Sequence, residues 1–332
     1  MRSLVVVALV CVTGAGMAQR KAKDDRSGYD RAARATLIHD AIVYVSGDEG
    51  SQKLSEVEAG HEVVVMDRSG AWVKVFANTD TPDQRDDQPE FAEAAERAPE
   101  SGWIKDKGVI TPATPGGDAI LFGAAETEED EAEEPHAPKG AATAAHLLYR
   151  RVFEYFPNSP YAAEAAFRSA DIRWQLDKRD ISTLPSAKEQ EAYLRPTIYE
   201  GDMKKVIRGW PNSTQAALAA YDLIDNKLCG DWQGLPKCPE METQLYLRYA
   251  DQYRDSPKAA EAMYKAVYRE GVLVNMYTLD DEKKRADAVA KQVQGLAEEM
   301  KARFPKSDYT PRALSVAYRV AQGIPIYGND KD

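Results

Sequence analysis

The chain has little of the chemistry from which catalytic and metal sites are usually built. Its 332 residues include four histidines and three cysteines. No histidine stands in H-E-x-x-H or another ligand spacing, and no P-loop, G-x-G-x-x-G turn or G-x-S-x-G elbow occurs. Carboxylates are plentiful, but they concentrate in one acidic stretch and on predicted helix surfaces, where solvation explains them. The sequence therefore predicts no catalytic residue, no cofactor and no metal ligand, and we expect a protein that is not an enzyme.

The chain also lacks an excess of positive charge. It has 43 Lys and Arg against 54 Asp and Glu, which gives a formal net charge of −11. A nucleic-acid-binding face must neutralise phosphates with basic residues, and an anionic membrane surface attracts the same residues. The composition argues against both kinds of partner.

Long apolar runs are missing too, apart from one at the start of the chain. Residues 4–12 are apolar but too few to span a bilayer as a helix. They follow a short basic start and precede Gly16 and Ala18, which are small residues at the −3 and −1 positions of a cleavage site. We therefore expect a signal peptide over residues 1–18, cleaved before Gln19.

Cleavage at this position predicts an exported protein, periplasmic or secreted, with no transmembrane segment in the mature chain. Val10 precedes Cys11, where lipoprotein signals carry a small residue, and this argues against a lipid anchor. Residues 19–34 are polar and charged, and we expect them to be flexible.

Export leaves two cysteines, Cys229 and Cys238. They flank a turn-like stretch that contains Gly230, Gly234 and Pro236. An even pair in an oxidising compartment indicates a disulfide bond that closes a loop, and two buried free thiols are the alternative. A metal site is disfavoured because no histidine or further cysteine lies nearby.

Short strand-like runs fill residues 35–112. Runs rich in Val, Ile and aromatic residues occur at 42–45, 62–66 and 72–76, and glycines with Asp and Ser neighbours separate them. Short strands punctuated by turn residues predict a small all-β barrel. An acidic insertion at residues 78–100 interrupts the region.

The order of landmarks in this region resembles a bacterial SH3-like (SH3b) domain. Gly60 leads a Val-rich strand, a W-x-x-V strand follows at Trp72, and a G-W-I strand follows at Gly102–Ile104. The resemblance implies a small β-barrel that binds cell-wall peptide or another protein. Trp72 and Trp103 are its candidate ligand-binding aromatics, and the alternative is that they fill the barrel.

Residues 123–142 consist mainly of Glu, Ala and Pro, with almost no large apolar side chain. Such a segment buries too little surface to offset its ordering entropy, and its like charges extend it. We expect an acidic disordered linker that holds the barrel away from the rest of the chain. A calcium site is a weaker interpretation, because the alternating ligands and the glycine of a calcium loop are missing.

Residues 143–328 have the period of amphipathic helices, and one block recurs four times. In each block an aromatic residue, usually followed by Pro, precedes a Ser and then a set of small residues. We expect the aromatic to end one helix, the Ser to cap the next, and the alanines to let the two helices approach closely. The pattern predicts four helical hairpins, with blocks at residues 156–167, 210–221, 253–264 and 304–314.

These blocks resemble tetratricopeptide-like repeats, as found in outer-membrane assembly lipoproteins of the BamD type and in periplasmic proteins associated with the Tol–Pal machinery. The resemblance implies an all-α solenoid whose hairpins stack into a curved surface that binds a protein partner. Aromatic residues outside the core would be the anchors of that surface. The candidates are Tyr161, Tyr199, Tyr246, Tyr277 and Tyr309.

The sequence therefore predicts a multidomain, non-catalytic scaffold of the cell envelope. Envelope proteins are the expected partners, and peptidoglycan is a candidate ligand of the SH3-like unit. Two alternatives stay open. The chain is an accessory or targeting subunit of a peptidoglycan-acting enzyme, or such an enzyme itself, or it is an outer-membrane protein assembly factor.

Overall fold

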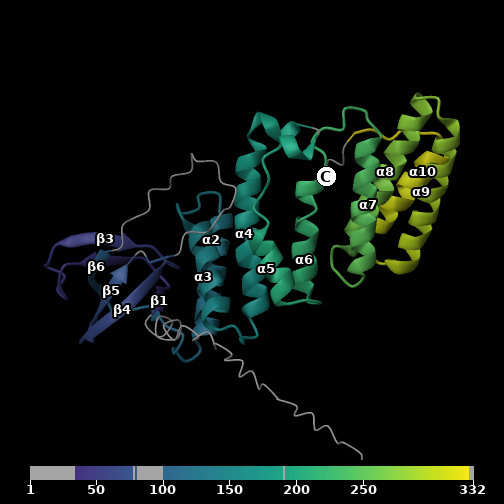
Figure 1. The fold of residues 1–332 in the computed structure, drawn as a ribbon. Helices are drawn as coiled ribbons and strands as arrows, with labels where there is room; N and C mark the ends of the chain where they lie inside the picture. The colour runs from purple at the N-terminus through teal and green to yellow at the C-terminus, as the bar shows by residue number, and fades with distance from the viewer. Residues whose placement is uncertain (1–33, 78, 81–99, 190, 329–332) are drawn as a thin grey trace, which may run out of the picture.

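The computed structural model describes residues 34–77, 79–80, 100–189 and 191–328, and it places a β unit ahead of a row of helices (Figure 1). The predicted signal peptide, nearly all of residues 19–34 and most of the acidic insertion lie outside the described residues. Within the described part, no helix combines the length and the apolar character that a membrane span requires.

The β unit is one antiparallel sheet curled into a half-barrel, which confirms a β region at this place in the chain (Figure 1). The strand order is β3-β2-β6-β5-β4-β1-β7. Side chains alternate between faces along a strand, so Val73 and Val75 enter the β core while Trp72 and Lys74 face the other way. The strands of the described residues are β1 Arg34–Leu37, β2 Ala41–Tyr44, β3 Lys53–Val57, β4 Glu62–Ser69, β5 Trp72–Ala77, β6 Glu100–Lys105 and β7 Val109–Ile110.

The helices follow one another away from the sheet, so the described part of the chain is elongated (Figure 1). Neighbours in the chain pack as pairs, notably α3 with α4, α5 with α6, α7 with α8 and α9 with α10. In the described part of the chain the helices are α2 Gly117–Glu133, α3 Ala141–Tyr155, α4 Ala162–Ser182, α5 Gly201–Gly209, α6 Thr214–Asp222, α7 Lys237–Gln252, α8 Ala259–Leu279, α9 Lys283–Arg303 and α10 Tyr309–Ala321. Short 3₁₀ turns occur at Pro185–Lys188 (η1), Ala192–Leu194 (η2) and Asp225–Lys227 (η3).

Each of the four repeated blocks forms the corner of one helix pair, which confirms the predicted helical hairpins. The aromatic residue ends the first helix in every copy, with φ between −132° and −117° and ψ between 53° and 62°. The serine amide then donates to the carbonyl oxygen of that aromatic at 2.9–3.2 Å. The same backbone turn is therefore built four times from Phe156, Trp210, Tyr253 and Phe304.

The predicted serine cap is correct in one copy and wrong in three. Ser213 is the N-cap of α6, and its Oγ accepts a hydrogen bond from the Ala216 amide at 3.0 Å. After Ser159, Ser256 and Ser307 the helix begins two or three residues later, and the hydroxyl accepts from the amide two residues on. A short turn closed by the serine carbonyl fits between the corner and the helix in these copies, so the serine precedes the cap position.

The predicted disordered linker at residues 123–142 is wrong, because α2 occupies about half of it. The apolar side of α2, which includes Phe122, packs against α3 and the end of the sheet. Arg168 on α4 pairs with Glu126 at 2.9 Å and with Glu129 at 2.8 Å. The apolar residues of α2 lie mostly before the acidic run in the sequence. The positive charge that pairs with this run comes from Arg168 of the neighbouring helix α4.

The sheet is therefore not separated from the helices by a linker but packs directly on them. Arg151 on α3 is 3 % exposed and donates hydrogen bonds to Asp80, to Glu154 at 2.7 Å and to the Gly60 carbonyl at 3.2 Å. Its guanidinium also lies 3.8 Å from the buried Glu62 carboxylate on β4. Gly60 has φ of 80°, and an added Cβ there would meet atoms of α3 at 2.7–3.0 Å. The close approach of sheet and helix thus requires glycine.

The disulfide bond between Cys229 and Cys238 is confirmed, with a Cα–Cα distance of 5.9 Å. The loop that it closes leads into α7 and contains Trp232, which is 2 % exposed. Glu242 on α7 accepts hydrogen bonds from the Cys229 amide at 2.8 Å, from Trp232 Nε1 at 3.0 Å and from Arg269 Nε at 2.7 Å. One buried carboxylate therefore fixes this loop between α7 and α8.

Candidate binding groove on the helical array

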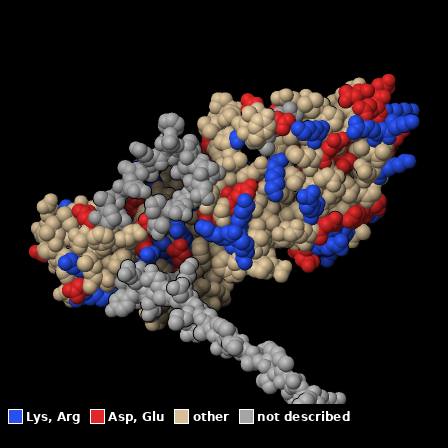
Figure 2. Space-filling view, viewed as in Figure 1, with Lys and Arg blue, Asp and Glu red and all other residues tan. Residues whose placement is uncertain are grey.

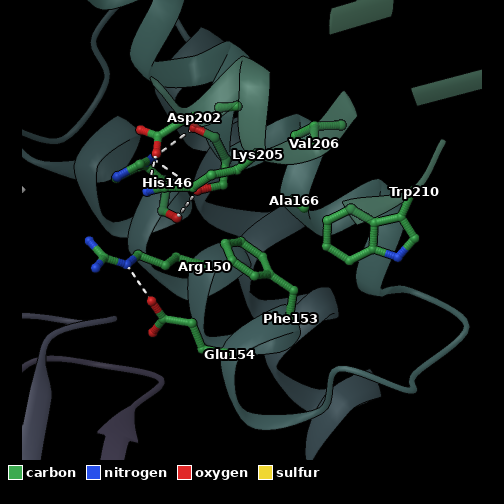
Figure 3. Close-up of a pocket in the computed structure, with 11 residues that line it drawn as sticks. His146, Arg150, Phe153, Glu154, Ala166, Asp202, Lys205, Val206 and Trp210 are labelled. Atoms are coloured by element: carbon green, nitrogen blue, oxygen red, sulfur yellow. Dashed lines mark hydrogen bonds and ion pairs between the residues drawn. The ribbon is translucent and has the colours of Figure 1, made fainter. Parts of the chain in front are cut away.

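A cavity of about 250 Å³ opens where the first two helical hairpins meet (Figure 3). Its walls come from both helices of the first hairpin, α3 and α4, and from α5, the first helix of the second hairpin. The cavity therefore exists only because the two hairpins stack. We call it the α3–α5 groove.

One wall of the α3–α5 groove is apolar and aromatic. Trp210, the aromatic that ends α5, stands edge to face with Phe153 of α3, with ring centroids 6.2 Å apart. Ala166 and Ala170 lie one helical turn apart on α4, and Val206 faces them from α5. The alanines leave open the space that larger side chains would fill, so the groove can receive an apolar side chain.

The charged residues lie together on the other side of the groove (Figure 3). Arg150 Nε donates to Glu154 Oε1 at 2.7 Å, and Lys205 Nζ donates to Asp202 Oδ1 at 2.8 Å. Arg173 approaches the same Asp202 at 3.5 Å. The rim thus presents ion pairs whose charges largely offset each other, and a ligand needs no net charge to enter.

His146 and Ser169 form the polar end of the groove, but they do not form a nucleophile and its base. His146 Nδ1 lies 2.7 Å from the Ser169 carbonyl oxygen, so it must carry the proton that it donates there. The Ser169 hydroxyl donates to the His146 carbonyl at 3.0 Å. Since a protonated Nδ1 cannot accept the hydroxyl proton, the pair links α3 to α4 and does not activate the serine.

The structure places Trp72 and Trp103 on the same face of the sheet, away from the β core. Both are half-buried, and Trp72 packs edge-on against Tyr44 at 5.5 Å. Trp103 on β6 is paired with Tyr44 on β2 and with Lys74 on β5, and Tyr44 is in turn paired with Lys53 on β3. These four residues form one row across four strands. The valine-rich core is filled without either tryptophan.

The five candidate tyrosines are not gathered at one site, and none lines the α3–α5 groove. Tyr246 and Tyr277 are 3 % and 2 % exposed, so the prediction that they anchor a partner is wrong: they pack within the helical layers. Tyr161 stacks on Phe122, Tyr309 stacks on Tyr264, and Tyr199 lies beneath the Arg173 guanidinium. These three are half-buried or partly exposed.

Sequence reasoning missed the groove because its residues come from three helices. The repeated block identifies Trp210 only as a helix-ending aromatic, although its ring also forms the groove wall. Phe153 lies on α3 beside the apolar stripe that the helical period reveals. The signal that could have found the site is the pair Ala166 and Ala170, because small residues on a stacked face leave room for a ligand.

Comparison with known proteins gives no family for this chain. It matches no protein-family model and no curated protein sequence. Among the described residues, no group of three or more His, Cys, Asp or Glu side chains is arranged to hold a metal ion.

Proposed function

We propose that this chain is a non-catalytic scaffold of the cell envelope, and that its helices form a tetratricopeptide-like array that binds a segment of a partner protein. The observation that carries the proposal is the α3–α5 groove. Its aromatic wall and its paired rim charges suit an apolar side chain, the kind of anchor that dominates protein–protein recognition.

Two features support a repeat array. The corner turn has the same backbone geometry in all four hairpins. Consecutive hairpins also touch: α4 packs on α5, α8 packs on α9, and the Tyr249 hydroxyl of α7 donates to the Ala217 carbonyl of α6 at 2.9 Å. Stacking of like units with mainly nearest-neighbour contacts is the arrangement expected of a solenoid.

The compartment is supported by the disulfide bond. Disulfides persist in oxidising compartments and are rare where thiols are kept reduced. The bond between Cys229 and Cys238 agrees with export by the signal peptide predicted for residues 1–18.

A site-specific crosslink tests the groove. Lys205 has a 62 % exposed side chain at the groove rim, and its neighbour Lys204, 55 % exposed, does not line the groove. With a photo-crosslinking residue in place of Lys205, we expect one envelope protein to be captured in vivo, and far less of it from position 204. Equal capture from both positions, or none from 205, would show that the groove is not the binding surface.

A second binding activity is favoured by the row of Tyr44, Trp103 and Lys74 across the sheet. The half-buried Trp103 ring beside Lys74 suits a ligand that combines apolar faces with carboxylates, and cell-wall peptide has both. We expect the mature protein to co-sediment with purified peptidoglycan, and Trp103→Ala to reduce the bound fraction about tenfold.

The matched control is Trp232→Phe, a tryptophan in the helical half. Binding that is the same with and without Trp103 would contradict the assignment to this row. Release of soluble fragments from the peptidoglycan would instead favour the enzyme alternative. Lowered β-barrel protein levels after depletion would favour the outer-membrane assembly alternative.

A further inference from the structure

A second cavity lies between the end of α4, η3 and the start of the disulfide loop. Its volume is about 360 Å³. The end of α4, residues 195–198 and residues 228–230 contribute its walls. It is separate from the α3–α5 groove, since the two share no lining residue.

Arg195, which lines this cavity, is a guanidinium without a carboxylate partner. Among the described residues it forms no ion pair, and its side-chain hydrogen bond goes to the Leu228 carbonyl. Its Nε is shielded from solvent and has no acceptor within the described part of the chain. Burial lowers the pKa of this guanidinium, and the charge of Glu242 opposes that effect without cancelling it.

This arrangement differs from that of the other arginines in the interior. Arg151 and Arg269 are 3 % and 4 % exposed, and each is paired with a carboxylate. A partly desolvated cation that lacks such a partner attracts an anion more strongly than a paired one, because no existing contact has to be broken.

The rest of the cavity adds a second cation and apolar walls. Lys178 Nζ lies 2.7 Å from Asp225 Oδ2, so the two cations of the lining face a single acid. The lining therefore carries a net positive charge in a chain whose net charge is −11. Apolar side chains form much of the remaining surface: Ile181, Pro196, Ile198 and Leu228.

We propose that this cavity binds a carboxylate carried on an apolar group, such as the C-terminal residue of a peptide with an aliphatic side chain. The carboxylate would pair with Arg195, whose planar fork matches a carboxylate, and the aliphatic part would contact the apolar walls. A free phosphate fits less well, because a strongly hydrated dianion gains nothing from those walls and finds only one unpaired cation.

The test uses the mature protein and three small probes followed by backbone amide chemical shifts. N-acetyl-leucine carries the carboxylate and the aliphatic group, N-acetyl-leucinamide lacks only the charge, and inorganic phosphate lacks the aliphatic group. We expect saturable shifts at residues 195, 197, 198 and 228–230 with N-acetyl-leucine, and about tenfold weaker binding of the other two. Equal binding of the amide, tighter binding of phosphate, or no saturable shift with any probe would overturn the proposal.

Variants then assign the charge. Arg195→Gln should weaken N-acetyl-leucine binding about tenfold, and Lys178→Gln should weaken it less because that lysine already has a partner. Arg179→Gln is the matched control, since Arg179 is 72 % exposed and lies outside the cavity. Arg195→Gln also removes the hydrogen bond to Leu228 and could disturb the loop. In that case Lys178→Gln and the comparison of the three probes on the unmodified chain still test whether the cavity binds the carboxylate. An Arg179→Gln effect as large as that of Arg195→Gln would refute the site.

Discussion

Replacing Arg151 with alanine should destabilise the protein by about 3–5 kcal/mol, because Arg151 is the most buried cation of an ion-pair network and its removal leaves buried carboxylate charge poorly compensated. The substitution leaves Asp80 and Glu62 without their shared cation and removes the contact to the Gly60 carbonyl. Urea unfolding measures the loss. Hydrogen exchange should show that β1 and β4 lose protection before the distant helices α8–α10.

The neighbouring Arg150 provides the matched control. It lies on the same helix, and its pair with Glu154 is partly exposed, with side chains 21 % and 32 % accessible. Arg150→Ala should cost about 1 kcal/mol or less, as is usual for accessible ion pairs. If both variants lose the same stability, Arg151 does not hold the sheet on the helices.

The junction should also respond to acid. Burial alone would raise the pKa of Asp80, but the hydrogen bond from His61 and the charge of Arg151 outweigh it and lower that pKa below its ordinary value of 3.8. A carboxylate whose pKa is lower in the folded state stabilises the fold above its unfolded pKa and loses this contribution as the pH falls. Glu62 has the opposite shift, since burial raises its pKa more than Arg151 and Arg34 lower it. Asp80 is therefore the member of the network that makes the junction acid-sensitive.

Replacing Glu270 with glutamine should stabilise the protein at alkaline pH. Glu270 on α8 is 6 % exposed, and its Oε2 has no hydrogen-bond partner among the described residues. Burial, with a smaller effect from Glu240, raises its pKa from 4.5 to about 7. Because the folded-state pKa is the higher one, the folded protein binds more protons between these values, and stability falls as the pH rises from about 4.5 to about 7.

The shift corresponds to roughly 3 kcal/mol, so Glu270→Gln should recover on the order of 2–3 kcal/mol at pH 8 and little at pH 4. Urea unfolding of both proteins across this pH range measures the difference. Some pH dependence should remain in the variant, since burial also raises the pKa of Asp222 to about 7. Glu298→Gln, at a 69 % exposed side chain, is the control and should change stability by less than about 0.5 kcal/mol. A gain that is the same at both pH values would contradict the assignment to ionisation.

The predicted elements that the structure confirms depend on local signals. The four aromatic–x–x–Ser blocks end one helix and precede the next, and in three of them a proline follows the aromatic and disfavours helix at that residue whatever surrounds it. The disulfide follows from an even pair of cysteines around a turn. The run of β-branched and aromatic residues on β5, bounded by turn residues, indicates a strand without knowledge of its neighbours.

The predictions that the structure contradicts concern features that depend on residues far apart in the sequence. The acidic run of α2 is ordered because Arg168, more than thirty residues later, lies beside it and because Phe122 finds a surface on α3. The burial of Tyr246 and Tyr277 depends on which neighbouring helices pack over theirs. A helical period in the sequence shows which stripe of a helix is buried, but not how wide a part of the helix its neighbours cover.

The sequence by itself determined that this chain has a β unit, a series of helical hairpins and a disulfide-closed loop, since each is encoded by residues close together in the chain. Only the tertiary structure decided that the sheet packs on α3 through Arg151, that hairpin stacking opens the α3–α5 groove, and that Arg195 is left without a carboxylate. These features depend on contacts between residues far apart in sequence, and such contacts leave no periodic or local pattern to read.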